Sequence, residues 1–245
     1  MIIDEQLKTR VLSHTSQDPS SESCGLIISE AGHATYVPCR NSSDFPSETF
    51  EISAEDWMAA EDRGEVLAVV HNHINGEQWL TGPDRLHQHL SKLPWVLVVD
   101  GKAKVFPYIR LLRGRPFNYK TDNCCTLISD AYQLCGLDKI EVYNTDNMEE
   151  DTSKQLLLEH LPKAGFKQVD KLQPGDVILT MFNREVTHAS LYIGQGEVLH
   201  HAYNQLSRRE PYSKTMQRNT HSFWRHSEWK PNMLQAIKND LENIL

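Results

Sequence analysis

Apolar residues in the first part of the chain recur with helical spacing and then with strand-like spacing. Leu7, Val11 and Leu12 follow Ile3 at intervals that give one face of an amphipathic helix, which is predicted to end before Asp18. Short β-branched or apolar runs predict strands at 25–29, 35–38, 66–70, 95–99 and 103–106, and helices are predicted at 54–62 and 84–90. This order predicts an α/β unit, a mixed sheet flanked by helices, that closes at about residue 108.

The second part of the chain has a different order of elements. Asn123 is a good N-cap for a helix over 124–135, and Gly136 suits its end. A further helix is predicted at 153–161. Strands are predicted at 176–181, 189–193 and 197–201, with a turn at Gln195-Gly196 between the last two. Helices followed by a sheet indicate an α+β unit.

Two domains are therefore expected in the 245 residues, a length that suits two domains better than one. We expect a first domain at 1–108, a linker at 109–117, a second domain at 118–235 and a C-terminal tail at 236–245. The linker is expected because residues 110–116 are basic and interrupted by Gly and Pro.

Composition narrows the classes of partner. A net charge of −8 disfavours nucleic acid, because phosphate binding needs clustered Lys and Arg. The apolar runs are far shorter than the roughly 20 residues of a bilayer span, so no transmembrane segment is expected. The first residues lack the regions of a signal peptide, so we expect synthesis in the cytoplasm. Five cysteines are an odd number and two of them are adjacent, which indicates free thiols.

His71 and His73 are the first candidate site residues. They follow the predicted strand 66–70, and alternate residues of an extended segment share a face, so both imidazoles can bind one ion. Asp84 supplies a third ligand, and three protein ligands plus water is the shell of a catalytic zinc ion. In the alternative interpretation, the histidines are ordinary strand-end residues and Thr81 and Asp84 form a helix cap.

Glu22 and Thr81 complete this candidate site. A zinc ion lowers the pKa of its bound water to roughly 7, and Glu22 can take the proton from that water. Thr81 can offer a hydroxyl to the oxyanion of an amide substrate. The arrangement of Glu22, His71-x-His73, Thr81 and Asp84 resembles the JAMM (MPN-type) metalloproteases. Two positions depart from the family pattern: Thr81 stands where the family has Ser, and Ile74 where Pro is common. Neither departure removes a ligand.

Cys124 and two histidines form the second candidate site. Cys124 begins the helix predicted at 124–135, where unpaired amides and the helix dipole favour the thiolate. His188 begins one predicted strand and His200 ends the next, so the two histidines can lie near each other on paired strands. A cysteine, a histidine and a group that orients the histidine are the elements of a cysteine peptidase.

These residues resemble the NlpC-type, papain-like family of cell-wall peptidases. The resemblance rests on Asn123-Cys124, the run that begins with Gly175-Asp176, the run that begins with His188, and His200. It implies that Cys124 is the nucleophile, His188 the base and His200 the orienting residue. The family usually has Asp where this chain has Asn123. Cys125 is the alternative nucleophile, and a buried inert thiol at 124 is the alternative role for the first cysteine.

A third resemblance covers both modules and rests on the runs Glu22-Ser-Cys-Gly-Leu, Pro38-Cys-Arg-Asn41, Ala59-Ala-Glu-Asp62, Leu93-Pro-Trp95 and Leu199-His-His201. From about residue 3 to residue 230, the chain resembles lambda-like phage tail tip assembly proteins, which join these two modules in this order. The resemblance implies a tail tip component or assembly factor in the virion. Other tail tip proteins and peptidoglycan would be its partners, and it would act at the host cell wall or periplasm. Two further hypotheses remain open: both peptidase folds serve as docking surfaces, or the first domain is an isopeptidase of the ubiquitin type.

Overall fold

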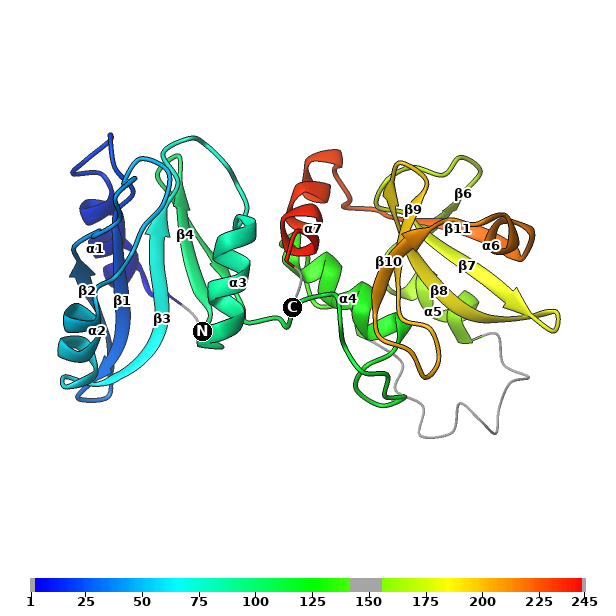
Figure 1. Cartoon of the computed structure of the whole chain (residues 1–245), viewed down its shortest axis with the longest axis horizontal. Coiled ribbons are helices and arrows are strands. Elements are labelled where there is room, and N and C mark those ends of the chain that lie inside the picture. Colours follow the sequence, from blue (N-terminus) through cyan, green and yellow to red (C-terminus); the bar gives the residue numbers. More distant parts are fainter. Residues whose placement is uncertain (1–2, 142–155, 244–245) are drawn as a thin grey trace. The chain divides into compact units, whose positions relative to one another are not determined.

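The computed structural model describes residues 3–141 and 156–243. The chain divides into two compact units, Met1–Arg110 and Leu111–Leu245. The first unit runs from blue to green and the second from green to red in Figure 1. Each unit has its own sheet, and each is described separately below.

The first unit contains a five-stranded mixed sheet with the strand order β2-β1-β3-β4-β5. Only β3 and β4 are parallel, and the other neighbours are antiparallel. A tight turn joins the last two strands, and Asp100 and Gly101 both have positive φ, as the hairpin signal predicts. The strands are β1 (Cys24–Glu30), β2 (His33–Cys39), β3 (Glu65–Asn72), β4 (Trp95–Val99) and β5 (Lys102–Phe106).

Three helices accompany this sheet: α1 (Glu5–Thr15), α2 (Ala54–Glu61) and α3 (Gly82–Ser91). Leu7 and Val11 of α1 are buried against the sheet, as the apolar spacing predicts. The mixed α/β architecture is therefore confirmed for this unit. The sheet residues of this core are Ile27, Tyr36, Ala68, Val70, Val96 and Val98.

The second unit contains a six-stranded antiparallel sheet with the strand order β10-β9-β8-β7-β11-β6. The sequence predicted the central strands β7 (Val177–Phe182), β8 (Glu185–Gly194) and β9 (Glu197–His200). It did not predict the three strands that flank them, which are β6 (Phe166–Val169), β10 (Arg208–Pro211) and β11 (Thr220–His226).

Helices of the second unit are α4 (Cys124–Leu134), α5 (Leu156–Lys163), α6 (Lys214–Arg218) and α7 (Leu234–Leu241). Helix α4 packs on β8 and β9, and α7 packs on α4. The expected start of the helix at 153 lies outside the described residues. The segment expected to be a tail contains most of α7, where Ile237 is fully buried and the Asp240 carboxylate accepts the Leu112 N–H at 2.8 Å. The expectation of a tail is therefore wrong for residues 236–241, which form part of a helix whose inner face is packed in this unit.

The Gly175-Asp176 motif has a structural role at the start of β7. Gly175 has a φ of 95°, and a Cβ there would lie 1.9 Å from the Trp229 ring, so only glycine fits. Asp176 is completely buried, and its two oxygens accept hydrogen bonds from Arg225 at 2.7 and 2.8 Å. This ion pair ties β7 to β11 and accounts for the buried carboxylate.

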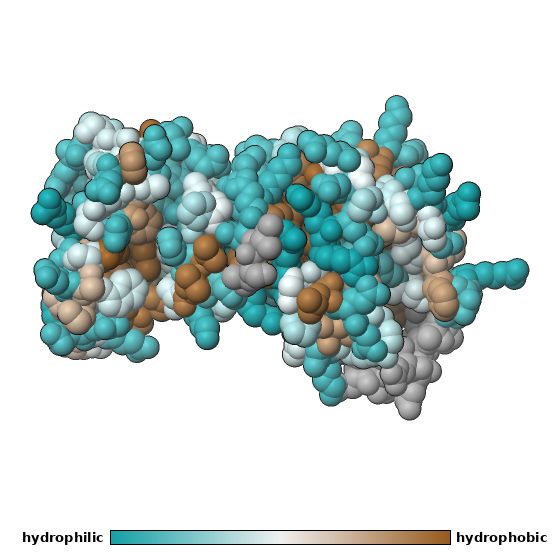
Figure 2. Space-filling model, viewed as in Figure 1, coloured by the Kyte–Doolittle hydropathy of each residue, from teal (hydrophilic) through white to brown (hydrophobic). Residues whose placement is uncertain are grey.

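The face shown in Figure 2 is mostly hydrophilic, with small separate groups of hydrophobic residues in both units. No helix in the described part of the chain has the length and apolar character needed to cross a membrane.

The packing of α7 yields a stability prediction. Ile237→Ala is expected to lower the free energy of unfolding of the second unit by about 2–5 kcal/mol, because it leaves a cavity in a closed core. Lys238→Ala, at the exposed neighbouring position, is the control and is expected to change it by about 0.5 kcal/mol or less. Denaturant unfolding measures both. Equal midpoints for the two variants would contradict the packed helix.

Candidate functional sites

The end of β3 and the start of α3 bring the first set of candidate residues together. His71 lies on β3, and His73 follows the strand, where its N–H donates to Val98 O at 3.1 Å and so continues the pairing with β4. Thr81 caps α3, which places Asp84 in the first helical turn. All three predicted ligands are buried, and their side chains meet at one point.

The three ligand atoms form a small triangle. His71 Nε2 and His73 Nε2 are 3.0 Å apart, and Asp84 Oδ2 lies 3.1 Å from the second and 3.5 Å from the first. Ligands of a tetrahedral zinc ion, at bond lengths of about 2.0–2.1 Å, are about 3.3 Å apart. The spacing of the side chains therefore fits a zinc shell with one position left open.

Hydrogen bonding fixes the direction of the lone pair on His73. Its Nδ1 lies 2.9 Å from the carbonyl oxygen of Glu77, which can only accept, so Nδ1 carries the proton and Nε2 is free to bind a metal. His71 stacks on Phe50 with ring centroids 4.6 Å apart, and its Nδ1 has no hydrogen-bond partner in the described part of the chain. Lone pairs and a carboxylate directed at one point repel each other unless a proton or a metal ion lies between them.

Thr81 contacts Asp84 rather than the open position. Its hydroxyl donates to Asp84 Oδ2 at 2.7 Å, its N–H donates to the same oxygen at 2.8 Å, and together they form a capping box. The cap interpretation and the ligand interpretation of this pair are thus compatible. Burial alone would raise the pKa of the Asp84 carboxyl, but the charges and hydrogen bonds of His71 and His73 hold it well below its usual range.

Glu22 lies just before β1 and is also buried. Its N–H donates to Pro46 O at 2.6 Å, and its carbonyl oxygen accepts from Asn41 Nδ2 at 2.8 Å, so the backbone at this residue is fixed. Burial raises the pKa of the Glu22 carboxyl to about 7. The charge of His73 lowers this pKa, and the charge of Asp84 raises it. A carboxylate with a pKa near neutrality suits a general base.

Asn123 positions Cys124 at the start of α4 in the second unit. Its Oδ1 accepts from the N–H groups of Cys125 and Thr126 at 2.9 and 3.0 Å, and its Nδ2 donates to Tyr119 O at 2.7 Å. An Asp here would cap the helix but could not make the second contact. The departure from the usual Asp therefore has a local structural reason.

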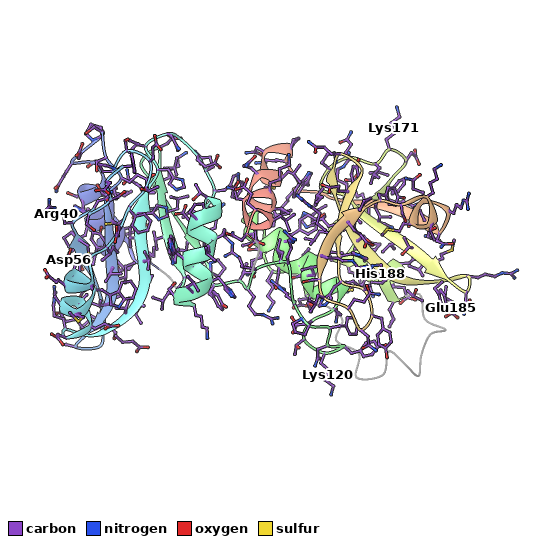
Figure 3. All side chains as sticks on the ribbon, viewed as in Figure 1. Arg40, Asp56, Lys120, Lys171, Glu185 and His188 are labelled. Carbon is purple, nitrogen blue, oxygen red and sulfur yellow. The ribbon has the colours of Figure 1, made fainter. Side chains whose placement is uncertain are left out.

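The paired strands β8 and β9 bring the two predicted histidines together. Ser190 pairs with His200 across the strands, and His188 Nε2 lies 3.0 Å from His200 Nδ1. Figure 3 labels both His188 and Glu185 on β8, where His188 is partly buried and Glu185, at the start of the strand, is exposed. His200 Nε2 in turn lies 2.9 Å from Glu210 Oε1 on β10. The sequence analysis missed Glu210, because it missed β10.

The surroundings of Cys124 favour its thiolate. The Cys125 thiol, 3.9 Å away, lowers the pKa of Cys124 well below its usual range, burial opposes this, and a hydrogen bond and the charge of His188 lower it further. The same contact and burial raise the pKa of Cys125 well above its usual range. These directions favour Cys124 over Cys125 as the nucleophile.

A cleft of about 540 Å³ opens beside this cysteine. Aromatic side chains form one part of its wall, with the Phe117 and Tyr119 rings 5.0 Å apart and the Phe117 and Tyr203 rings 5.4 Å apart. His201, which follows His200 at the end of β9, is buried and also reaches this wall. The cleft is lined by Phe117, Tyr119, Asn123, Cys124, Cys125, Phe182, Thr187, His188, His201, Ala202 and Tyr203.

Comparison with known proteins places this geometry in a family. Residues 114–225 match the NlpC/P60 family. The tail tip assembly protein K of Escherichia phage lambda is 42% identical over 193 residues, which cover 78% of this chain and 96% of that protein. The protein of the same name from Escherichia phage N15 is 28% identical over 230 residues, which cover 91% of this chain and 95% of that protein. The chain therefore belongs to the family of phage tail tip assembly protein K and carries an NlpC/P60 domain in its second unit.

Proposed function

We propose that this protein is a tail tip component or assembly factor whose second unit is a cysteine peptidase that cleaves stem peptides of peptidoglycan. The observation that carries the proposal is the line of contacts from Cys124 through His188 to His200 beside an open cleft. The NlpC/P60 match supports a hydrolase of this class. The relatives named tail tip assembly protein K support the virion tail as its place and other tail tip proteins as partners.

The peptidase step follows from the positions of these side chains. His188 takes the proton of the Cys124 thiol, Sγ attacks the carbonyl carbon of the scissile amide, the C–N bond breaks, and His188 gives that proton to the leaving amine. Water then attacks the resulting thioester, His188 takes up a proton from that water, the C–S bond breaks, and the proton returns to Sγ. His200 accepts a hydrogen bond at Nδ1 from His188 Nε2. This contact holds the His188 ring in the orientation that the proton transfer needs.

The start of α4 also offers a donor for the tetrahedral intermediate. The Asn123 cap takes the N–H groups of Cys125 and Thr126, whereas the Cys124 N–H has no acceptor among the described residues. That N–H stands at the positive end of the helix dipole. It is therefore suited to donate to the oxyanion that forms next to Sγ.

For the first unit we propose a zinc-dependent amide hydrolase of the JAMM type, with a tail protein as its substrate. His71, His73 and Asp84 would hold the ion, which when bound supplies a polarising positive charge and an activated water. Glu22 would act as the base, since its carboxyl is buried and has a pKa of about 7. Thr81 would hold Asp84 in place through two hydrogen bonds.

A second candidate function is docking without catalysis. The aromatic wall of Phe117, Tyr119 and Tyr203 favours this alternative, because exposed tyrosines are common in protein interfaces. Against it stands the lowered pKa of Cys124, which a purely structural thiol does not need.

Metal analysis tests the first unit. The wild type, refolded in zinc, is expected to bind one equivalent, and Asp84→Ala is expected to lose most of it because one of three ligands is removed. Glu22→Gln is the matched control and is expected to retain the metal while losing any amidase activity, because the base is not a ligand. Elemental analysis measures the zinc. A Glu22 variant that also loses zinc would show that this residue is a ligand.

Alkylation tests the thiolate. Cys124 is expected to react with iodoacetamide faster than the other four cysteines, and to remain reactive as the pH falls below the usual range of a thiol, because its pKa is lowered. Burial raises the pKa of Cys24 to about 12 and that of Cys39 to about 11, so these two are expected to be slow. Fragmentation of the labelled peptides separates Cys124 from Cys125. Faster labelling of Cys125 would reverse the assignment.

Purified sacculi test the proposed reaction. Release of new amino groups is expected from the wild type and is expected to fall at least a hundredfold in Cys124→Ser, because a hydroxyl is much harder to deprotonate than a thiol. Cys135→Ser, a distant buried cysteine, is the control and is expected to stay within about twofold of the wild type, because it lies outside the cleft. Equal release by the Cys124 variant and the wild type would favour docking.

A further inference from the structure

Glu210 stands at the end of the line of contacts that begins at Cys124. It lies on β10, two residues after Arg208, which pairs with His200 of β9. Alternate residues of a strand share a face, so the long Glu210 side chain can reach diagonally to His200. Its Oε1 lies 2.9 Å from His200 Nε2, and its Oε2 accepts from Arg208 Nε at 2.7 Å.

The contacts of His200 restrict where its proton can be. Burial lowers the pKa of His200 to about 4, with a further contribution from the charge of His188, so near neutral pH its ring carries one proton. The proposed peptidase step needs a proton on His188 Nε2, and a proton on His200 Nδ1 would then face it across 3.0 Å. If the His200 proton is on Nε2, Nδ1 can accept from His188, and Nε2 lies 2.9 Å from a carboxylate oxygen that can only accept, which is the distance of an ion pair and not an aligned hydrogen bond.

We propose that Glu210 is a positioning residue that holds His200 in its Nε2–H tautomer and so sets the orientation of His188 toward Cys124. The inference rests on the proposed peptidase function of the second unit. Arg208 contributes by binding the other carboxylate oxygen, which keeps the Glu210 side chain turned toward the histidine. The line of contacts therefore has four members, the last of them on a strand at the edge of the sheet.

Glu197 provides a matched control on the neighbouring strand. It is a partly exposed carboxylate on β9, and it lies 3.6 Å from Arg209 of β10, much as Glu210 pairs with Arg208. Its side chain is 34% exposed, against 29% for Glu210. The substitution Glu197→Met thus removes the same charge from the same pair of strands without removing a contact of His200.

Histidine nitrogen NMR of the full-length protein tests the tautomer directly. In the wild type and in Glu197→Met, His200 is expected to show a protonated Nε2 and an unprotonated Nδ1. In Glu210→Met, which keeps the length of the side chain but has no acceptor, the His200 signals are expected to shift toward a mixture of both tautomers. The loss of His200 signals in His200→Gln assigns them. A destabilised strand alone would lower the unfolding midpoint without changing the tautomer.

Kinetics supply the second measurement. Glu210→Met is expected to lower both the alkylation of Cys124 and the release of amino groups from sacculi by about tenfold or more, while Glu197→Met stays near the wild type. Glu210→Gln keeps one acceptor oxygen for two donors, so its rates of alkylation and of amino-group release are expected to lie between those of Glu210→Met and those of the wild type. If Glu210→Met does not fold, the glutamine variant carries the test.

An unchanged tautomer and unchanged alkylation in the tested Glu210 variant would overturn the proposal. An equal loss in Glu197→Met would overturn it as well, because the effect would then be one of charge and not of contact. Failure of the proposed peptidase function is distinguishable. Wild type that releases no amino groups would refute that function, whereas the tautomer and the alkylation of Cys124 would still report on Glu210.

Discussion

Buried imidazoles need partners, and this requirement shapes both units of the protein. Each unit places two histidines 3.0 Å apart and adds one carboxylate beside them: Asp84 next to His71 and His73, and Glu210 next to His200. A buried imidazole without partners is costly, so the backbone that brings these rings together must supply hydrogen bonds or a charge at the same time. Strand ends and paired strands meet this requirement because their side chains lie at fixed spacings.

The two arrangements differ in geometry, and this difference is the basis of the different functions proposed for them. In the first unit all three side chains direct one atom each at a common point, so their partial negative charges add up and are relieved by a proton or a metal ion at that point. In the second unit the contacts form a line, in which His188 Nε2 lies 3.0 Å from His200 Nδ1 and His200 Nε2 lies 2.9 Å from the Glu210 carboxylate. A line of this kind suits the orientation of rings and proton transfer, which is the role proposed for the second unit, and a convergent triangle suits the metal proposed for the first.

The elements that the sequence predicted are those with a strong local signal. The apolar runs of β1, β3, β4, β7, β8 and β9 are rich in β-branched residues, and α4 has both its cap and its terminating glycine. The strand β10, with the sequence Arg208-Arg-Glu-Pro211, has no apolar alternation and forms because β9 offers it an unpaired edge. Helix α7 was missed for the opposite reason: its apolar residues lie at a chain end, where a tail is the simpler expectation.

Single residues of the candidate sites follow the same rule: those with a strong local sequence signal were predicted, and those without one were missed. His71, His73 and Asp84 were predicted to meet because alternate residues share one face of a strand and the start of the next helix places Asp84 beside that face. His188 and His200 followed from a turn that joins two adjacent strands. Glu210 carries no such signal, since a carboxylate in a polar run usually faces solvent. Only the register between β9 and β10 shows that it lies beside a buried histidine, so the group proposed to position the site is harder to predict than the proposed nucleophile and base.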